Sequence, residues 1–150
     1  MSMIAIACDH AGIDLKPSVI AVLDELGITY KDFGTNSHES VDYPVYGAKA
    51  AQAVADGVCE RGIVLCGTGV GIGMAAGKVH GIRCVTCSDT YSAKMSRLHN
   101  DANMLALGSR VLGTELAKDI VRVWLMTAFE GERHARRVGM INKLDRGETL

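Results

Sequence analysis

The sequence predicts a three-layer α/β/α domain built on a parallel sheet of about five strands. Three observations support this prediction. Apolar runs of strand length alternate along the chain with amphipathic segments of helical period. The 150 residues have the length of one ordinary domain, and 48% of them are hydrophobic, which is enough for a substantial core. No linker, repeat or low-complexity segment interrupts the alternation, so we expect a single domain over residues 1–150.

Each predicted element follows from its own pattern. The strands are short apolar runs, as expected where both faces of a parallel sheet are covered, and the helices place their apolar residues on one face. In chain order we expect strand 3–8, helix 15–26, strand 28–33, helix 44–58, strand 61–66, helix 70–79, strand 82–86, helix 90–98, strand 104–107, helix 114–128 and helix 132–144.

Turn and capping residues support several of these boundaries. Gly27 closes the first helix, because glycine adopts the left-handed conformation that ends helices. Pro44 stands in the first turn of the second helix, where its missing N–H is no loss. The segment 114–128 carries the strongest helical pattern, with Ile120, Val121 and Trp124 on one face.

Composition excludes several classes of protein. Sixteen basic and 17 acidic residues give a net charge of −1, so bulk charge does not attract nucleic acid. No apolar run reaches the roughly 18 residues of a transmembrane helix, and residues 1–9 lack the basic start of a secretory signal. The five cysteines are an odd number, which argues against a disulfide framework and for a reducing compartment. We therefore expect a cytoplasmic protein that binds neither nucleic acid nor membrane.

The Cys84–Cys87 pair forms a C-x-x-C motif, which suggests redox chemistry or zinc. Two further ligands at zinc spacing are missing, and Cys84 falls inside a predicted strand rather than at a helix start. We interpret both as buried strand cysteines.

Polar and small residues stand at the ends of the predicted strands. In open α/β sheets the ligand site lies beyond the carboxyl ends of the strands. We therefore expect these residues to gather at one edge, including those that stand just before the fifth strand. They are Asp9, His10, Tyr43, the segment 66–73, His99, Asn100 and Arg110.

The segment 66–73 is the most informative. It joins a strand to a helix and holds four glycines in eight residues, a composition that lets backbone N–H groups converge on an anion. It lacks the lysine of a P-loop and comes after the third strand rather than the first, unlike a dinucleotide fingerprint. Ile72 stands where a cysteine-dependent phosphatase would need arginine. What remains is Cys66 beside a helix N-terminus, which favours a thiolate that acts as nucleophile or base; a buried, inert cysteine is the alternative.

Arg133 and Arg137 are four residues apart and share one face of the last helix. Two arginines on one face suit a dianionic phosphate. A solvent-exposed basic face explains the spacing equally well.

Taken together, the chain resembles the ribose-5-phosphate isomerase B family, which includes galactose-6-phosphate isomerases. The resemblance covers nearly the whole chain, and the order and spacing of its short motifs are specific. The motifs lie at residues 6–12, 42–44, 66–71, 96–101, 108–110 and 130–137. The family uses either a cysteine base or a glutamate directly after the last loop glycine; Ile72 occupies that second position here, so the chain resembles the cysteine users.

The resemblance implies a Rossmann-like subunit in a homodimer or a dimer of dimers. It also implies interconversion of an aldose phosphate and a ketose phosphate with no metal and no organic cofactor. The active site is expected at the subunit interface, with a C-terminal helix of about residues 132–147 contributing to the dimer and to the phosphate site.

The resemblance further implies a role for each candidate residue. Cys66 is expected to be the base, Asp9 to move hydroxyl protons, and His99 to open the sugar ring as an acid. His99 and Asn100 are expected from the second subunit. The loop amides of Gly67, Thr68, Gly69, Val70 and Gly71 are expected to hold the enediolate oxygens, and Thr68 is expected to be a catalytic residue that hydrogen-bonds nearby. Tyr43 and Asn100 are expected to bind the sugar hydroxyls, and the phosphate is expected to be bound by His10, Arg110, Arg133 and Arg137.

Two alternatives remain open. An isomerase of six-carbon sugars or their phosphates, such as allose 6-phosphate or galactose 6-phosphate, would need the same residues. A non-catalytic sugar-phosphate sensor on the same fold is the second alternative, but simple binding needs neither Cys66 nor His99.

Overall fold

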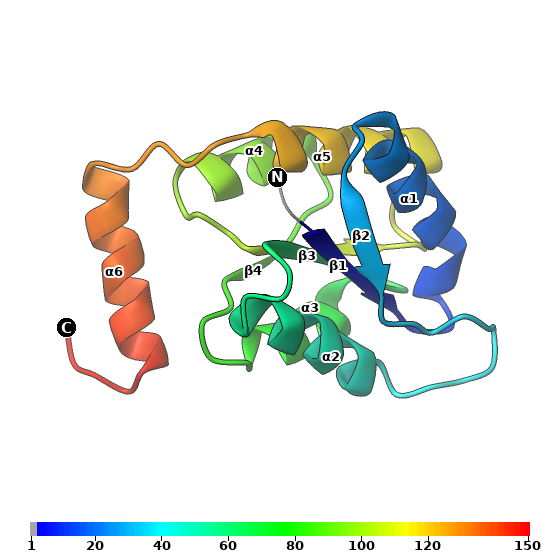
Figure 1. Cartoon of the computed structure of the whole chain (residues 1–150), viewed down its shortest axis with the longest axis horizontal. Helices are drawn as coiled ribbons and strands as arrows, with labels where there is room; N and C mark the ends of the chain where they lie inside the picture. The colour runs from blue at the N-terminus through cyan, green and yellow to red at the C-terminus, as the bar shows by residue number, and fades with distance from the viewer. Residues whose placement is uncertain (1–2) are drawn as a thin grey trace.

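A computed structural model of the protein describes residues 3–150, in which five strands form one sheet between two layers of helices (Figure 1). The strand order is β2-β1-β3-β5-β4, and every neighbouring pair is parallel. The predicted three-layer fold is therefore confirmed.

The elements are β1 Met3–Cys8, a 3₁₀ turn Gly12–Leu15, α1 Lys16–Glu25, β2 Thr29–Asp32, α2 Tyr43–Ala55, β3 Arg61–Cys66, α3 Val70–Gly77, β4 Cys84–Thr86, α4 Thr90–Leu98, β5 Met104–Gly108, α5 Thr114–Met126 and α6 Arg133–Asp145.

Two hydrophobic cores cover the two faces of the sheet. Helices α1, α4 and α5 pack on one face around large side chains such as Trp124, which is fully buried. Helices α2 and α3 cover the other face through small residues, mostly alanines. Small residues let these two helices approach closely: a Cβ on Gly47 would lie 2.9 Å from the Ile72 side chain. The sheet is thus buried on both sides, as its apolar strands predict.

The observed boundaries differ from the predicted ones by a few residues, and backbone geometry explains the main differences. The helix expected over 15–26 begins as a 3₁₀ turn, because the Asp9 carboxylate binds the N–H groups of Ala11 and Gly12 and tightens the chain there. Helix α2 ends at Ala55 rather than at 58, since Gly57 adopts a positive φ of 76°. Gly27 closes α1 with a φ of 67°, as predicted.

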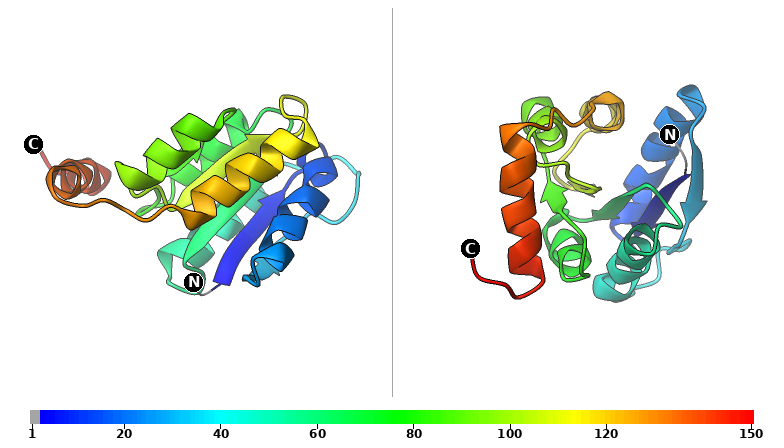
Figure 2. Two further views of the ribbon diagram at one scale, coloured as in Figure 1. Left: turned by 90° about the horizontal axis from the view of Figure 1, so that it is seen from above. Right: turned by 60° about the vertical axis from the view of Figure 1, so that its left-hand side comes forward.

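Helix α6 stands to one side of the sheet rather than on either face of it (Figures 1 and 2). Polar contacts join it to the segment before β4. Arg83 donates a hydrogen bond to Asn142 Oδ1 at 3.0 Å, and the Gly81 N–H donates to Asp145 Oδ2 at 2.7 Å. Met140, Ile141 and Leu144 on this helix remain exposed. Over the described part of the chain, no helix is both long and apolar enough to span a bilayer.

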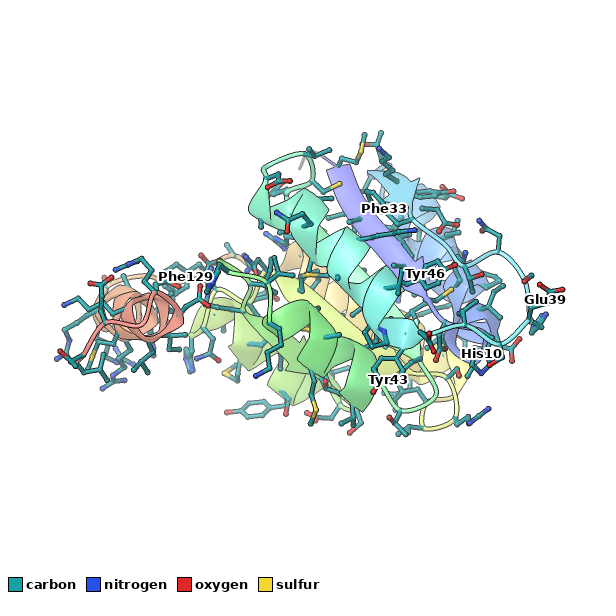
Figure 3. The ribbon with its side chains drawn as sticks, turned by 90° about the horizontal axis from the view of Figure 1, so that it is seen from below. His10, Phe33, Glu39, Tyr43, Tyr46 and Phe129 are labelled. Carbon is teal, nitrogen blue, oxygen red and sulfur yellow. The ribbon has the colours of Figure 1, made fainter. Side chains whose placement is uncertain are left out.

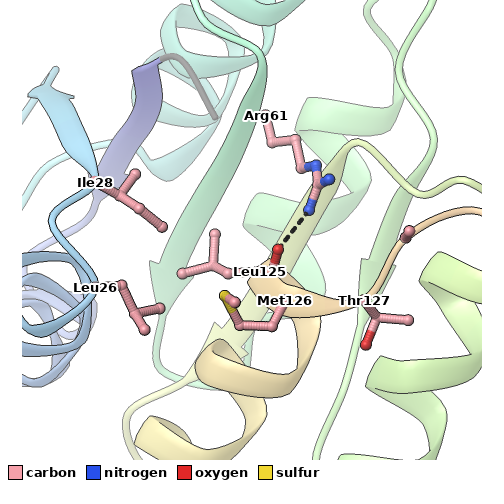
Figure 4. Close-up of a pocket in the computed structure, with 7 residues that line it drawn as sticks. Leu26, Ile28, Arg61, Leu125, Met126 and Thr127 are labelled. Carbon is pink, nitrogen blue, oxygen red and sulfur yellow. Dashed lines mark hydrogen bonds between the residues drawn. The ribbon is translucent and has the colours of Figure 1, made fainter.

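A cavity of about 380 Å³ opens at the amino edge of the sheet, beside the end of α5 (Figure 4). Its charged lining residue, Arg61, donates hydrogen bonds to the carbonyls of Trp124 and Leu125 and so caps the C-terminus of α5. Thr127, which also lines the cavity, donates a hydrogen bond from its hydroxyl to the Val123 carbonyl. Because the side chains of Arg61 and Thr127 both hydrogen-bond to backbone carbonyls at the end of α5, we do not interpret this cavity as a ligand site.

Candidate active site

The candidate site lies at the carboxyl edge of the sheet, around the end of β3. Cys66 is the last residue of this strand, and α3 begins four residues later. The chain returns to the same edge after β1, before α2 and after β5. Figure 3 labels His10 and Tyr43 at the same end of the molecule. The structure thus brings together the candidates that come after the strands.

The loop after β3 directs a backbone dipole at the Cys66 thiol. The Gly69 N–H donates to Cys66 Sγ at 3.1 Å, and the Val70 N–H donates to the Thr68 hydroxyl at 3.2 Å. The N–H of Gly71, in the first turn of α3, has no intrahelical acceptor and is free to bind another group. Three of the five amides expected to hold oxygens can therefore be distinguished. Those of Gly69 and Val70 organise the loop, whereas that of Gly71 can face a ligand.

Close backbone packing holds this loop in place. A Cβ on Gly108 would lie 2.5 Å from the Thr68 carbonyl carbon, and one on Gly69 would lie 2.9 Å from the Leu107 carbonyl carbon. Gly69 also adopts a positive φ of 81°, which side chains disfavour. The Ser109 N–H donates to the Cys66 carbonyl at 2.9 Å. Gly69 and Gly108 are therefore required for the close packing of the ends of β3 and β5, whether or not the loop binds an anion.

Asp9 and His10 come after β1 and are oriented by the chain's own hydrogen bonds. Asp9 is buried, and its Oδ1 accepts N–H bonds from Ala11 and Gly12 at 2.9 and 2.8 Å, which leaves Oδ2 for a ligand. His10 Nδ1 accepts the Val41 N–H at 3.1 Å. A neutral imidazole that accepts at Nδ1 carries its proton on Nε2, so His10 presents a donor there.

Tyr43 and Arg110 pack against the glycines of the loop. A Cβ on Gly71 would lie 2.7 Å from the Tyr43 ring, so the ring lies directly on the backbone there. The Arg110 guanidinium lies over Gly67, where a Cβ would be 3.4 Å from a guanidinium nitrogen. These two side chains place a hydroxyl and a positive charge on either side of the loop.

The other four cysteines have raised pKa values. Burial raises the pKa of Cys8 to about 11, of Cys84 to about 12 and of Cys87 to about 11, and it also raises the pKa of Cys59. These thiols are therefore protonated at neutral pH and act as apolar residues. The interpretation of both residues as buried strand cysteines is right only in part, since Cys84 lies in β4 but is half-buried, and Cys87 is buried but comes after the strand.

The expectation that all polar candidates gather at one edge is wrong for His99 and Asn100. They come after α4, which runs back from the carboxyl ends of the strands, and so they lie at the amino edge. Arg83, which precedes β4, donates to the Asn100 carbonyl at 3.2 Å. Arg133 and Arg137 lie on α6 on that same side of the molecule. Residues that precede a parallel strand lie at the opposite edge from those that come after it, so closeness to a strand in sequence does not place a residue at the carboxyl edge.

A second cluster surrounds His99. Its ring stacks on that of His134 with 4.1 Å between centroids and 9° between planes, and its Nε2 lies 3.8 Å from Glu130 Oε2. Burial lowers the pKa of His134, and the adjacent His99 and Arg133 lower it further. His134 and Glu130 belong to the motif 130–137, but nothing in the sequence shows that α6 returns to His99. Only the path of the chain after α5 reveals the contact.

Comparison with known proteins agrees with this arrangement. A model of the family described as Ribose/Galactose Isomerase matches residues 4–141. The chain belongs to the ribose/galactose isomerase family. The resemblance deduced from the motifs is confirmed, and the protein is an isomerase.

Individual relatives cover this isomerase from end to end. It is 52% identical to ribose-5-phosphate isomerase B of Escherichia coli, over 97% of each chain. It is 44% identical to D-erythrulose-4-phosphate isomerase of Pectobacterium atrosepticum, over 99% of this chain and 98% of the relative. The structure of ribose-5-phosphate isomerase B from Clostridium thermocellum matches with a TM-score of 0.94 and 53% identity, covering 97% and 98% of the two chains.

Proposed function

We propose that this isomerase interconverts ribose 5-phosphate and ribulose 5-phosphate through a cis-enediolate, with Cys66 as the base. The observation that carries the proposal is the Cys66 thiol at the end of β3, facing the Gly69 N–H at 3.1 Å. An N–H dipole and a helix N-terminus stabilise a thiolate at this position. Burial raises the pKa of the other four thiols, whereas the Cys66 thiol stands at the carboxyl edge of the sheet and accepts the loop N–H.

The reaction moves one carbon-bound proton and one hydroxyl proton. The Cys66 thiolate removes the C2 proton of the open-chain aldose, and the electron pair forms the C1–C2 double bond while negative charge gathers on the C1 oxygen. The thiol then returns the proton to C1. Asp9, through the oxygen that the loop leaves free, carries the hydroxyl proton between the two oxygens.

The loop and its neighbours stabilise the charge that develops. In this proposal the N–H groups of Gly67, Thr68 and Gly71 donate to the enediolate oxygens, and each such donor lowers the barrier by on the order of 3 kcal/mol. The Gly69 and Val70 amides keep the thiol and Thr68 in position. Tyr43 binds a sugar hydroxyl, and the His10 Nε2–H and Arg110 bind the phosphate.

We propose that the remaining groups come from a second copy of the chain, in a homodimer or a dimer of dimers. His99 opens the furanose ring as an acid, Asn100 binds sugar hydroxyls, and Arg133 and Arg137 bind the phosphate. The support is their position: within one chain they lie at the opposite edge from Cys66. The exposed apolar residues of α6 give a second subunit a surface to cover.

The chemistry needs no metal and no organic cofactor, because a thiolate, a carboxylate and amide donors supply every proton and charge that the reaction requires. Five free cysteines fit a reducing compartment, and we propose that the enzyme works in the cytoplasm. A relative at 44% identity is named for a four-carbon sugar phosphate, so the substrate assay includes that compound.

The primary test measures isomerisation of ribose 5-phosphate by the purified enzyme and by Cys66→Ala. We expect turnover to fall about 1,000-fold, within the range that a positioned acid or base contributes, while ribose 5-phosphate still binds. Cys59→Ala, which removes another buried cysteine far from the loop, is the matched control and should retain its turnover. Undiminished turnover in Cys66→Ala would refute the assigned base. D-Erythrulose 4-phosphate, allose 6-phosphate and galactose 6-phosphate, assayed in parallel, define the substrate.

A second test addresses ring opening. His99→Asn should lose more activity on cyclic ribose 5-phosphate than on ribulose 5-phosphate, which has no furanose ring to open when its phosphate occupies the C5 oxygen. An equal loss in both directions at matched substrate saturation would contradict the role of His99 as the ring-opening acid.

A further inference from the structure

Three side chains with metal-binding atoms meet at the amino edge, away from the Cys66 loop. His99 ends α4, Glu130 lies in the connection between α5 and α6, and His134 lies in the first turn of α6. Their candidate ligand atoms all lie within 4.8 Å of one another. Three separate segments therefore bring two imidazoles and one carboxylate to a single point.

His134 is the unusual member of this cluster. Only 6% of the residue is exposed, and its Nε2 is buried with no hydrogen-bond partner in the described chain. Leaving a buried polar atom unpaired costs free energy, so such an atom in a folded protein requires an explanation. A bound ion beside the ring would account for it.

We propose that His99, Glu130 and His134 bind one divalent transition-metal ion of the zinc class, and that the bound ion inhibits the isomerase. Two imidazoles and a glutamate are a ligand set that zinc uses, with a fourth position left to water. Magnesium and calcium prefer oxygen ligands alone, so the two imidazoles select against them.

The cluster needs a small rearrangement to close on an ion. Ligand atoms at the usual zinc distances of about 2.0–2.2 Å lie roughly 3.3 Å from one another. The side chains of His99 and Glu130 are 38% and 42% exposed, so they can turn toward the more buried His134 and separate the two stacked rings. Arg133 and Arg137 place positive charge near His134 and oppose a cation, whereas Glu130 attracts it. We therefore expect affinity in the micromolar range.

The inhibitory effect rests on the proposed role of His99. An imidazole whose nitrogen is bound to a metal cannot donate a proton from that nitrogen to the ring oxygen of the sugar. The ion would thus block ring opening, and removing it with a chelator would restore activity. It is an inhibitor rather than a cofactor, since the Cys66 chemistry proceeds without it.

The direct test titrates the purified full-length protein with Co²⁺, a spectroscopic substitute for Zn²⁺, in the absence of substrate. We expect one Co²⁺ per chain, with visible bands of a nitrogen and oxygen site and without the near-ultraviolet band of a cobalt thiolate. His134→Asn and Glu130→Gln should each weaken binding at least tenfold. His80→Asn is the matched control, because His80 faces a single carboxylate, Asp145, at 3.4 Å, and it should bind Co²⁺ as the wild type does.

Three outcomes would overturn the site: no saturable binding, binding that neither His134→Asn nor Glu130→Gln weakens, or a thiolate band that identifies Cys66 as the ligand. Glu130→Gln alters an exposed side chain, so it keeps the test decisive even if His134→Asn does not fold.

The inhibition has its own readout. Zn²⁺ should inhibit turnover of ribose 5-phosphate, EDTA should reverse it, and Glu130→Gln should need at least tenfold more Zn²⁺ for the same fractional inhibition. Equal sensitivity in Glu130→Gln would exclude this site as the cause.

Co²⁺ binding without substrate does not depend on the proposed isomerisation, so failure of the site and failure of the Cys66 mechanism are distinguishable. Co²⁺ binding that persists in Cys66→Ala would support the site even if that variant disproved the base.

Discussion

The two edges of the sheet are built in different ways. At the carboxyl edge, strand ends and glycines pack so closely that Gly12, Gly69 and Gly108 have no room for a Cβ, and the Gly69 N–H donates to the Cys66 thiol. At the amino edge, α6 contacts the segment before β4 through a few hydrogen bonds, and its apolar side chains remain exposed. The contacts of the first edge are made within one chain. The second presents groups that this chain cannot bring to its own Cys66, and this difference is the main structural argument that two chains share each site.

Mixing two inactive variants gives the strongest test of that difference. Cys66→Ala and His99→Asn should each lose about 1,000-fold in turnover. If the two residues of one site come from different chains, co-refolding equal amounts of the two variants should restore about a quarter of wild-type activity, because half of the dimers are mixed and each mixed dimer has one intact site. Steady-state turnover of the refolded mixture measures this. If each chain holds a complete site, the mixture will stay inactive.

The arginines of α6 should matter for phosphorylated substrates alone. Removing both with Arg133→Ala and Arg137→Ala should raise KM for ribose 5-phosphate by at least about 100-fold, since each charge-assisted contact contributes roughly 1.5–3 kcal/mol. Free sugars such as ribose or allose should show no comparable rise. Arg136→Ala, on the intervening position of the same helix, is the control. A similar rise for free sugars would remove the phosphate role.

Glycine substitutions should separate the packed edge from the open one. A Cβ on Gly108 would meet the Thr68 backbone at 2.5 Å, whereas one on Gly139 in α6 meets nothing within 4 Å. Gly108→Ala should therefore destabilise the fold by about 2–3 kcal/mol, as overpacking does. Gly139→Ala should stabilise it by up to about 1 kcal/mol, because alanine is the better helix former. Urea unfolding measures both; a neutral Gly108→Ala would show that the β3–β5 junction can yield to a methyl group.

The smallest expected effect is a loss of stability at low pH in the contact between α6 and the segment before β4. The hydrogen bond from the Gly81 N–H lowers the pKa of Asp145. Because the pKa is lower in the folded state, Asp145 contributes stability above its unfolded pKa of about 3.9, and this is lost as pH falls through the lower folded value. Hydrogen exchange of α6 amides should therefore accelerate below about pH 4 relative to α5. Asp145→Asn should remove that added pH dependence, while Asp24→Asn in α1 should keep it.

Much of the carboxyl edge was predictable from local sequence. The order of strands and helices places Asp9, Cys66 and Arg110 at or just after strand ends. Gly67 and Gly69 mark the loop between β3 and α3, and Gly71 follows in the first turn of α3. The division of labour among the loop amides was not predictable, because it depends on which N–H points at the thiol. The prediction that His99 lies at the carboxyl edge was wrong, because His99 precedes a strand, and residues that precede a parallel strand lie at the amino edge. The contact of His134 with His99 was beyond local patterns, because 34 residues and a whole helix separate them.

The amino-acid sequence alone was enough for the layers of the fold and for the family, and it supplied the candidate residues, because hydrophobic period and motif spacing are properties of the chain. Which of those residues meet depends on the tertiary structure. In a parallel sheet, the residues before a strand and the residues after it are separated by the length of that strand, and each α/β crossover returns the chain to the opposite edge. The Cys66 loop and the His99 cluster are therefore held apart by the same alternation of strands and helices that made the fold recognisable.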